Sequence, residues 1–271
     1  MMARARRLLK EDLALVDVVL EVVEARAPLS SRNPELAKMM AGRRAGMLVL
    51  NKSDLAEPPA TKAWLDYWRK TGLAVLAVEA KTGKGIEEAE ALLKQMAAGR
   101  RNKRRAVRAM VIGIPNVGKS SVLNRLLGRS GARTGDLPGV TRGRQWVRLP
   151  GDLEVLDTPG ILWPGMGDPE VSFRMAALGA ISEDIFEREE VAARLLRFLL
   201  ERKPEALRQR YGEGTAGEDW STLEGIARRR GLLLPGGAPH LEKAATLLLK
   251  EFRQGRLGRY TLELPPPDGT T

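Results

Sequence analysis

The amino-acid sequence predicts an α/β domain with a mostly parallel sheet, followed by a smaller all-α domain. Short apolar runs at 17–23, 47–50 and 109–112 are typical of buried strands, and segments of helical periodicity separate them. Beyond a stretch rich in glycine and proline at 161–169, the periodicity is almost entirely helical. A chain of 271 residues that is 43% apolar is long enough for two cores. We therefore predict one domain over residues 1–164 and a second over residues 165–271.

The composition excludes several classes of protein. The chain has no cysteine, which rules out disulfides and thiolate metal sites. No run approaches the length of a membrane-spanning segment, and Lys10, Glu11 and Asp12 interrupt the basic N-terminus before the apolar core of a signal peptide forms. We therefore expect a cytoplasmic protein with no membrane partner.

The net charge of +11 is concentrated in the first domain. Residues 1–164 hold 29 basic and 17 acidic residues, whereas residues 165–271 hold 16 and 17. A basic first half indicates a polyanionic partner such as nucleic acid, although general solubility explains the charge equally well.

The first elements lead to a base-recognition motif. A basic helix is expected over 3–15 and a strand over 17–23, followed by a loop in which Asn33 caps the next helix at Pro34. The strand at 47–50 ends at Asn51-Lys52-Ser53-Asp54. An aspartate at this place accepts both N1–H and the exocyclic amine of guanine, whereas adenine offers no matching donors. Asn51 would tie the loop to the base or to a phosphate loop, and the Lys52 stem would lie over the ring.

A second loop of this kind follows the next strand. The helix at 60–70 carries Trp64 and Trp68, which we expect in the core. A strand over 73–78 leads into Glu79-Ala80-Lys81-Thr82-Gly83, which is similar to the S-A-K loop that offers a backbone N–H to guanine O6. A helix at 86–97 then precedes residues 99–108, of which six are basic. That run is either an RNA-contacting linker or a solvated connection.

The phosphate loop lies at the centre of the first domain. Residues 113–120 fit G-x-x-x-x-G-K-[ST], after the strand at 109–112 and before a helix at 121–127. The backbone N–H groups of Asn116 to Ser120 would surround phosphate oxygens at the helix N-terminus. Lys119 would reach the β- and γ-phosphates, and the Ser120 hydroxyl would hold Mg²⁺.

The switches follow the phosphate loop. Thr141 stands in a glycine-rich stretch at 134–142 and would close on Mg²⁺ and the γ-phosphate. A hairpin of 145–149 and 153–156 delivers Asp157, which would hold Mg²⁺ through water, and Gly160, whose N–H would report the γ-phosphate. Helices are then expected near 170–181, 187–201, 220–229 and 240–254, with strand-like alternation at 260–264 and a frayed tail after it.

The order of these motifs defines a circular permutation. Small GTPases present the phosphate loop, switch threonine, D-x-x-G, N-K-x-D and S-A-K in that order, whereas here the last two come first. The predicted fold is therefore a P-loop GTPase sheet that is circularly permuted. The predicted nucleotide contacts are Asn51, Lys52, Asp54, Ala80, Lys81, Asn116, Val117, Gly118, Lys119, Ser120, Ser121 and Gly160.

Nearly the whole chain resembles the ribosome biogenesis GTPase A family, which acts in late assembly of the bacterial large ribosomal subunit. The resemblance rests on E-A-R-A-P-L-S-S-R-N-P (24–34), N-K-S-D (51–54), G-I-P-N-V-G-K-S-S (113–121), P-G-V-T-R (138–142), L-D-T-P-G-I-L-W-P (156–164) and L-G-R-Y-T-L-E (257–263). It implies the large subunit and its rRNA as partners, a helical RNA-binding domain at 165–271, and a monomer off the ribosome. The sequence departs from the family at Glu24, where Asp is usual, and at Met1, which stands where a histidine would be. The only histidine, His240, is expected to be structural or RNA-facing.

Hydrolysis would depend on positioning and charge neutralisation by Lys119, Thr141, Gly160 and Asn116, with GTP and Mg²⁺. Ile161 stands where small GTPases have glutamine and cannot hydrogen-bond water, so we expect slow intrinsic turnover that the subunit stimulates. Asn116 resembles the asparagine of potassium-activated GTPases, which would hold a K⁺.

The motifs leave three candidate functions: a regulatory GTPase on pre-ribosomal RNA, a nucleotide-gated RNA-binding factor with negligible turnover, and a metabolic kinase. The N-K-S-D motif argues against the kinase, because it disfavours ATP. The candidate RNA contacts are residues 100–108 together with Arg228, Arg229, Arg230, Arg253, Arg256 and Arg259.

Overall fold

The computed structural model describes residues 2–34, 36, 38, 45–98, 107–128, 145–149, 153–157, 168–182, 185–212 and 219–267. The chain forms two compact units, 1–167 with 260–271 and 168–259. We call them the sheet unit and the helical unit. This division differs from the predicted one, which assigned all of residues 165–271 to the helical domain, because the last segment returns to the first unit.

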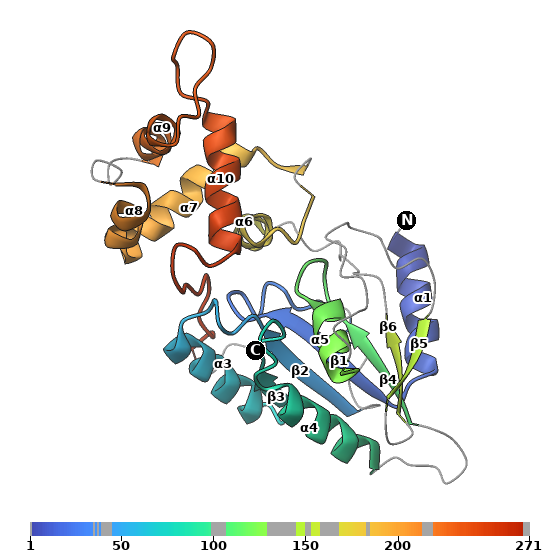
Figure 1. The fold of residues 1–271 in the computed structure, drawn as a ribbon. Helices are drawn as coiled ribbons and strands as arrows, with labels where there is room; N and C mark the ends of the chain where they lie inside the picture. Colours follow the sequence, from blue (N-terminus) through green and yellow to red (C-terminus); the bar gives the residue numbers. More distant parts are fainter. Residues whose placement is uncertain are drawn as a thin grey trace. The chain divides into compact units, whose positions relative to one another are not determined.

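The first unit is built on a six-stranded sheet with the order β3-β2-β1-β4-β6-β5 (Figure 1). The strands are β1 (Val18–Glu24), β2 (Ala45–Asn51), β3 (Ala74–Ala77), β4 (Val107–Ile112), β5 (Gln145–Leu149) and β6 (Leu153–Asp157). All neighbouring pairs are parallel except β5 with β6, which form the predicted antiparallel hairpin. The predicted α/β fold with a parallel sheet is thereby confirmed. The middle strand β1 is buried over its whole length, as a strand with both faces covered requires.

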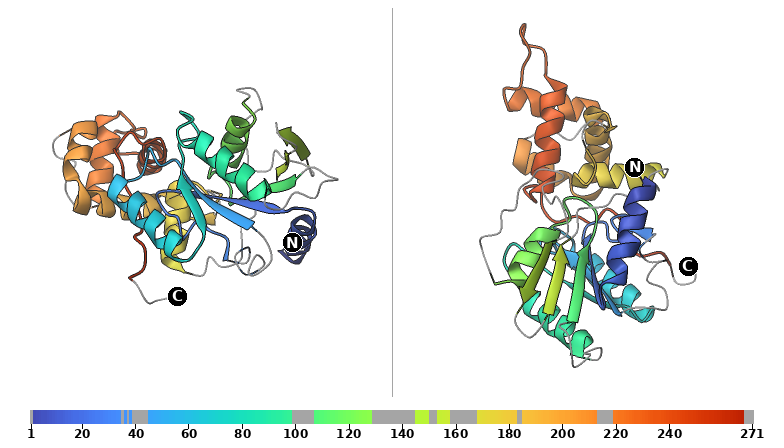
Figure 2. Two further views of the ribbon diagram at one scale, coloured as in Figure 1. Left: turned by 90° about the horizontal axis from the view of Figure 1, so that it is seen from below. Right: turned by 90° about the vertical axis from the view of Figure 1, so that its right-hand side faces the viewer.

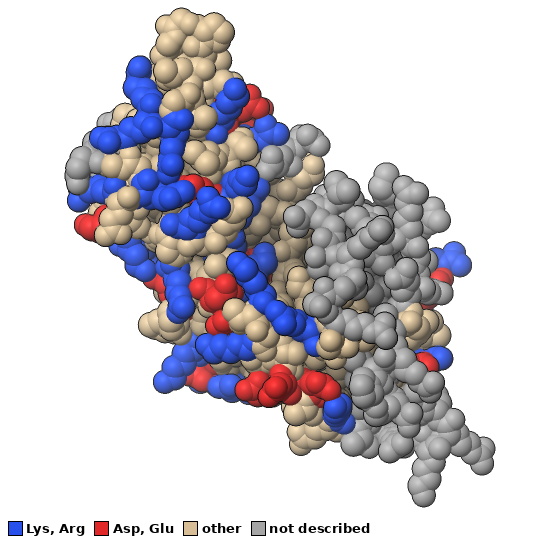
Figure 3. All heavy atoms as spheres, viewed as in Figure 1, with Lys and Arg blue, Asp and Glu red and all other residues tan. Residues whose placement is uncertain are grey.

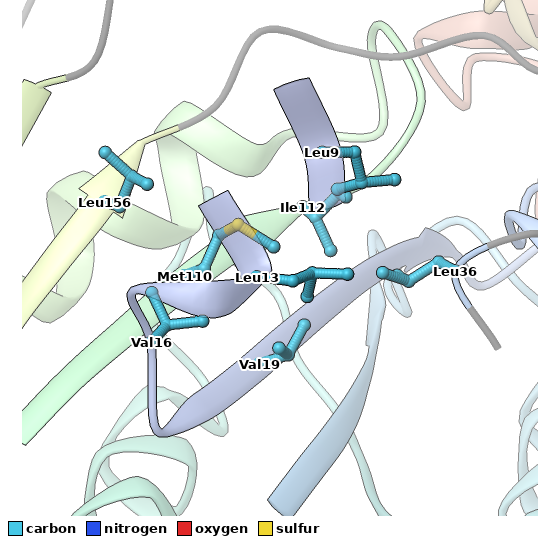
Figure 4. Close-up of a cluster of buried hydrophobic side chains, with 8 residues drawn as sticks. All are labelled: Leu9, Leu13, Val16, Val19, Leu36, Met110, Ile112 and Leu156. Carbon is cyan, nitrogen blue, oxygen red and sulfur yellow. The ribbon is translucent and has the colours of Figure 1, made fainter. Parts of the chain in front are cut away.

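Helices cover both faces of this sheet (Figure 2). On one face lie α1 (Met2–Ala14) and α3 (Pro58–Lys70), and on the other α4 (Ile86–Ala98) and α5 (Lys119–Leu126). Leu9 and Leu13 of α1 pack with Val19, Met110 and other apolar side chains of the central strands (Figure 4). The two tryptophans of α3 are buried against β2 and β3, as expected from the sequence.

A short C-terminal segment completes the first unit. Residues 260–263, which we call the C-terminal strap, do not form the strand expected there. The backbone N–H of Tyr260 instead donates to Leu55 O at 3.1 Å, and that of Leu262 to Arg26 O at 2.7 Å. The Glu263 carboxylate accepts from the backbone N–H groups of Leu29 (2.6 Å) and Ser30 (2.8 Å). The C-terminal strap therefore forms hydrogen bonds with loops, not with the edge of a strand. The prediction of a strand from the period-2 alternation was wrong for this reason.

The second unit consists of helices. They are α6 (Pro169–Leu178), α7 (Arg188–Arg202), α8 (Pro204–Tyr211), α9 (Asp219–Arg229) and α10 (Leu241–Arg253). The sequence predicted all but α8, whose eight residues follow α7 after a single residue, too short a segment for a clear period. In its interior Glu251 is buried, and it accepts hydrogen bonds from Arg210 Nε at 2.9 Å and from the Tyr211 hydroxyl at 2.8 Å. Within the described ranges, no helix is long and apolar enough to cross a membrane.

Candidate nucleotide-binding site

The phosphate loop connects β4 to α5 in the geometry that the motif requires. Gly118 precedes the first turn of α5 with φ 92°, and a Cβ there would lie 2.3 Å from Asn51 Nδ2, so only glycine fits. Asn116 also has a positive φ, of 61°. Lys119 Nζ donates to Ile114 O at 2.9 Å, which places the ammonium over the loop. Backbone N–H groups at a helix N-terminus beside an ammonium form an anion site.

Asn51 joins three loops at the end of β2. Its Nδ2 donates to Val117 O in the phosphate loop at 2.8 Å, and its Oδ1 accepts from Ala80 N at 3.1 Å. The side chain is 2% exposed, so both bonds are shielded from water. The motifs at 51–54, 79–83 and 113–120 are thus fixed to one another, although 66 residues separate Asn51 from Val117.

Lys52 is held from two sides. Its Nζ donates to Asn116 O at 2.7 Å and lies 2.6 Å from Glu24 Oε2. The expected role for Lys52 was to cover the base with its stem, and the structure adds this anchoring of the ammonium. Asp54, two residues on, is half-buried in the same loop.

The Ala80–Lys81 loop is fixed by a residue to which the sequence analysis gave no role. Arg125, in the last turn of α5, donates from Nε to Ala80 O at 2.9 Å and from Nη2 to Lys81 O at 2.5 Å. Glu79 and Lys84 close the loop at its base with a 3.1 Å ion pair. A contact across 45 residues leaves no local pattern, so no signal in a single sequence points to Arg125.

The predicted metal ligands are only partly within the described residues. Ser120 lies in the first turn of α5, and Asp157 ends β6 opposite Val111 of the neighbouring β4. Serine and aspartate are residue types whose oxygen atoms suit Mg²⁺. Thr141, Gly160 and Ile161 lie outside the described residues.

Two of the residues predicted to contact RNA have partners within the chain. Arg108, expected in a basic linker, lies in β4, pairs with Glu154 at 3.1 Å and stacks over Trp146 at 4.8 Å. Arg253 donates from Nε to Ala177 O and from Nη2 to Ala176 O at the C-terminal end of α6, at 3.1 and 2.8 Å. The other predicted contacts of the basic linker, up to residue 106, lie outside the described residues.

The phosphate loop after β4, the N-K-S-D motif after β2 and the sheet order together define a circularly permuted P-loop GTPase. A family profile described as "50S ribosome-binding GTPase" matches residues 108–211. The chain is 43% identical to Ribosome biogenesis GTPase A of Priestia megaterium, over 97% of this chain and 94% of that protein. It is 32% identical to the protein of the same name from Thermotoga maritima, over 97% and 91%. The chain belongs to the ribosome biogenesis GTPase A family.

Solved structures agree with this assignment. GNP-bound YlqF from T. maritima is 29% identical, with a TM-score of 0.70 over 97% of this chain and 98% of that one. The GDP-bound structure of the T. maritima YlqF gives a TM-score of 0.68 over 95% and 98%. The predicted fold and the predicted family are therefore both confirmed, and the chain is a GTPase.

Proposed function

We propose that this GTPase is an assembly factor that binds the precursor of the large ribosomal subunit and acts late in its maturation. The observation that carries the proposal is 43% identity over almost the full length to a protein named Ribosome biogenesis GTPase A. The profile described as "50S ribosome-binding GTPase" supports the same subunit. Cytoplasmic location and a monomeric state off the ribosome belong to this proposal.

The nucleotide would be bound by the linked loops of the sheet unit. Asp54 would recognise guanine, the Ala80–Lys81 loop would offer a backbone N–H to O6, and the phosphates would lie on Asn116 to Ser121 at the start of α5. Mg²⁺ would be held by Ser120, Thr141 and Asp157 and would neutralise charge that develops on the phosphates. Lys119 adds a fixed positive charge at the same place.

Hydrolysis of GTP by the chain on its own would be slow. Ile161 has no group that orients a water molecule, and we propose that the ribosomal subunit and a K⁺ held by Asn116 supply the missing stabilisation. A nucleotide-gated RNA-binding factor with negligible turnover is the second candidate, and Ile161 is the observation that favours it.

The helical unit would supply the RNA contacts. Lysine and arginine side chains cover much of its face in the view of Figure 3. Of the remaining candidates, Arg228, Arg229 and Arg259 are exposed, and Arg256 is 55% exposed although it lies 3.7 Å from Glu251. Arg230 stacks over Tyr211 at 5.4 Å, so its guanidinium has a structural partner as well.

The connection between the units would pass on the nucleotide state. The D-T-P-G motif (157–160) begins at the last residue of β6, the last described strand in chain order, and α6 of the helical unit begins at Pro169. Movement of Gly160 on loss of the γ-phosphate would therefore reach the helical unit directly. We propose that the GTP form presents its RNA-binding face and that the GDP form does not.

Co-sedimentation with large subunits tests this proposal. Binding is expected to be tighter with a non-hydrolysable GTP analogue than with GDP and to weaken steeply with salt, because phosphate contacts release counterions. Arg228→Glu with Arg229→Glu is expected to abolish most binding. Lys62→Glu with Lys70→Glu, which makes the same charge change on α3, is expected to have little effect. Equal binding in both nucleotide states would refute the switch, and no binding would refute the ribosomal role.

A further inference from the structure

Glu24, the last residue of β1, is a buried acidic residue beside the candidate site. It is 1% exposed, and its two carboxylate oxygens have different partners. Oε1 accepts from Arg26 Nε at 2.6 Å, and Oε2 lies 2.6 Å from Lys52 Nζ. One buried carboxylate thus joins the loop after β1 to the base-recognition motif.

The lysine that Glu24 contacts lies at a strained position. Among the described residues, Lys52 and Asn116 are the two non-glycine residues with positive φ, at 59° and 61°. A single hydrogen bond, from Lys52 Nζ to Asn116 O, connects them. Left-handed backbone at such residues persists only where its surroundings hold it. A lysine also has a long, flexible stem, so a second partner is needed to fix the ammonium.

The charges around Glu24 keep it ionised. Burial raises the pKa of this carboxyl, but the charges and hydrogen bonds of Arg26 and Lys52 outweigh burial and hold the pKa below its ordinary value. Glu21 on the same strand behaves differently. Burial raises its pKa, and Arg32 compensates only in part. Glu24 is therefore a fixed anion beside the Lys52 ammonium. Glu21 instead accepts hydrogen bonds from Arg32 Nε and from the backbone N–H of Asn33.

We propose that Glu24 is a positioning residue for nucleotide binding: its carboxylate holds Lys52 against the Asn116 carbonyl and so fixes the phosphate loop relative to the guanine-recognition loop. The inference rests on the proposed nucleotide site and adds to it a residue outside the loops that touch the nucleotide. Lys52 connects the turn of the phosphate loop to the guanine-recognition loop, and both loops would contact GTP and GDP in the same way. We therefore expect the affinities for the two nucleotides to change alike.

The test is the affinity for a fluorescent GDP and for a fluorescent non-hydrolysable GTP analogue. Glu24→Gln keeps the shape of the side chain and removes its charge, and we expect about tenfold weaker binding of both nucleotides, which corresponds to roughly 1.4 kcal/mol. Glu21→Gln is the matched control, a buried glutamate on the same strand, and is expected to change affinity by less than about twofold. Equal affinities of Glu24→Gln and the unaltered chain would overturn the inference.

A double-mutant cycle separates positioning from a purely structural role. In a Lys52→Met background Glu24→Gln is expected to have no further effect on affinity, whereas additive losses would overturn the inference. If Glu24→Gln fails to fold because Arg26 is left buried without its partner, Glu24→Gln with Arg26→Gln removes both charges and is expected to show the same tenfold loss. Failure of the unaltered chain to bind either nucleotide would overturn the proposed function as well, so the two failures are distinguishable.

Discussion

Replacing Asn51 by alanine is expected to weaken guanine-nucleotide binding by about 30- to 1,000-fold, equivalent to roughly 2–4 kcal/mol. The side chain is buried, and it satisfies the Val117 carbonyl at 2.8 Å and the Ala80 N–H at 3.1 Å. A buried backbone group that loses its partner costs roughly 1–3 kcal/mol. For the two groups together the cost is roughly 2–6 kcal/mol. The expected loss lies in the lower part of this range because loops relax when their bonds are lost. The cost of restoring their arrangement then appears as weaker binding.

The assay is titration of the full chain with a fluorescent GDP, with thermal unfolding measured in parallel. Ser53→Ala is the matched control, because it removes a 3.1 Å bond from the same loop to Val78 O without reaching the phosphate loop. This control is expected to lose less than about threefold in affinity. An Asn51→Ala protein that is folded and binds within about threefold of the unaltered chain would refute the reasoning that Asn51 couples the three loops.

Three further predictions follow from the site and from the helical unit. Asp54→Asn should lose roughly 2–4 kcal/mol of GTP affinity and gain affinity for xanthosine triphosphate, whereas equal binding of ATP and GTP by the unaltered chain would contradict guanine recognition. Turnover in KCl should exceed turnover in NaCl at equal ionic strength, and Asn116→Ala should abolish the difference; identical rates would exclude a potassium site. Hydrogen bonds from Arg210 and Tyr211 lower the pKa of Glu251 to about 2, against the opposing effect of burial. The ionised carboxylate therefore stabilises the folded chain above the unfolded pKa of about 4.3, and this stabilisation is lost as pH falls toward 2. The difference in free energy of unfolding between the unaltered chain and Glu251→Gln should therefore shrink by up to about 3 kcal/mol between pH 6 and pH 2, and a constant difference would contradict it.

The sequence by itself determined the sheet, the order of its motifs and the family. Apolar runs that end in N-K-S-D, E-A-K-T-G and the phosphate loop need only local patterns to be found, because strand burial and turn chemistry act over a few residues. The rotated order is a property of the sequence alone, since it is the position of each motif along the chain. Most helices of the second unit were also predictable from their apolar period, and α8 was missed because eight residues give too short a period.

Only the tertiary structure decided how these motifs are joined. The bonds from Asn51 to Val117 and from Arg125 to Ala80 span 66 and 45 residues, and the contact of Glu263 with Leu29 spans 234. Such contacts depend on where parallel strands end in space, and no spacing along the chain encodes them. The same reason explains Glu24 and the C-terminal strap. A glutamate at a strand end and an alternating segment near the C-terminus each fit several environments, and the packing of distant segments selects one of them.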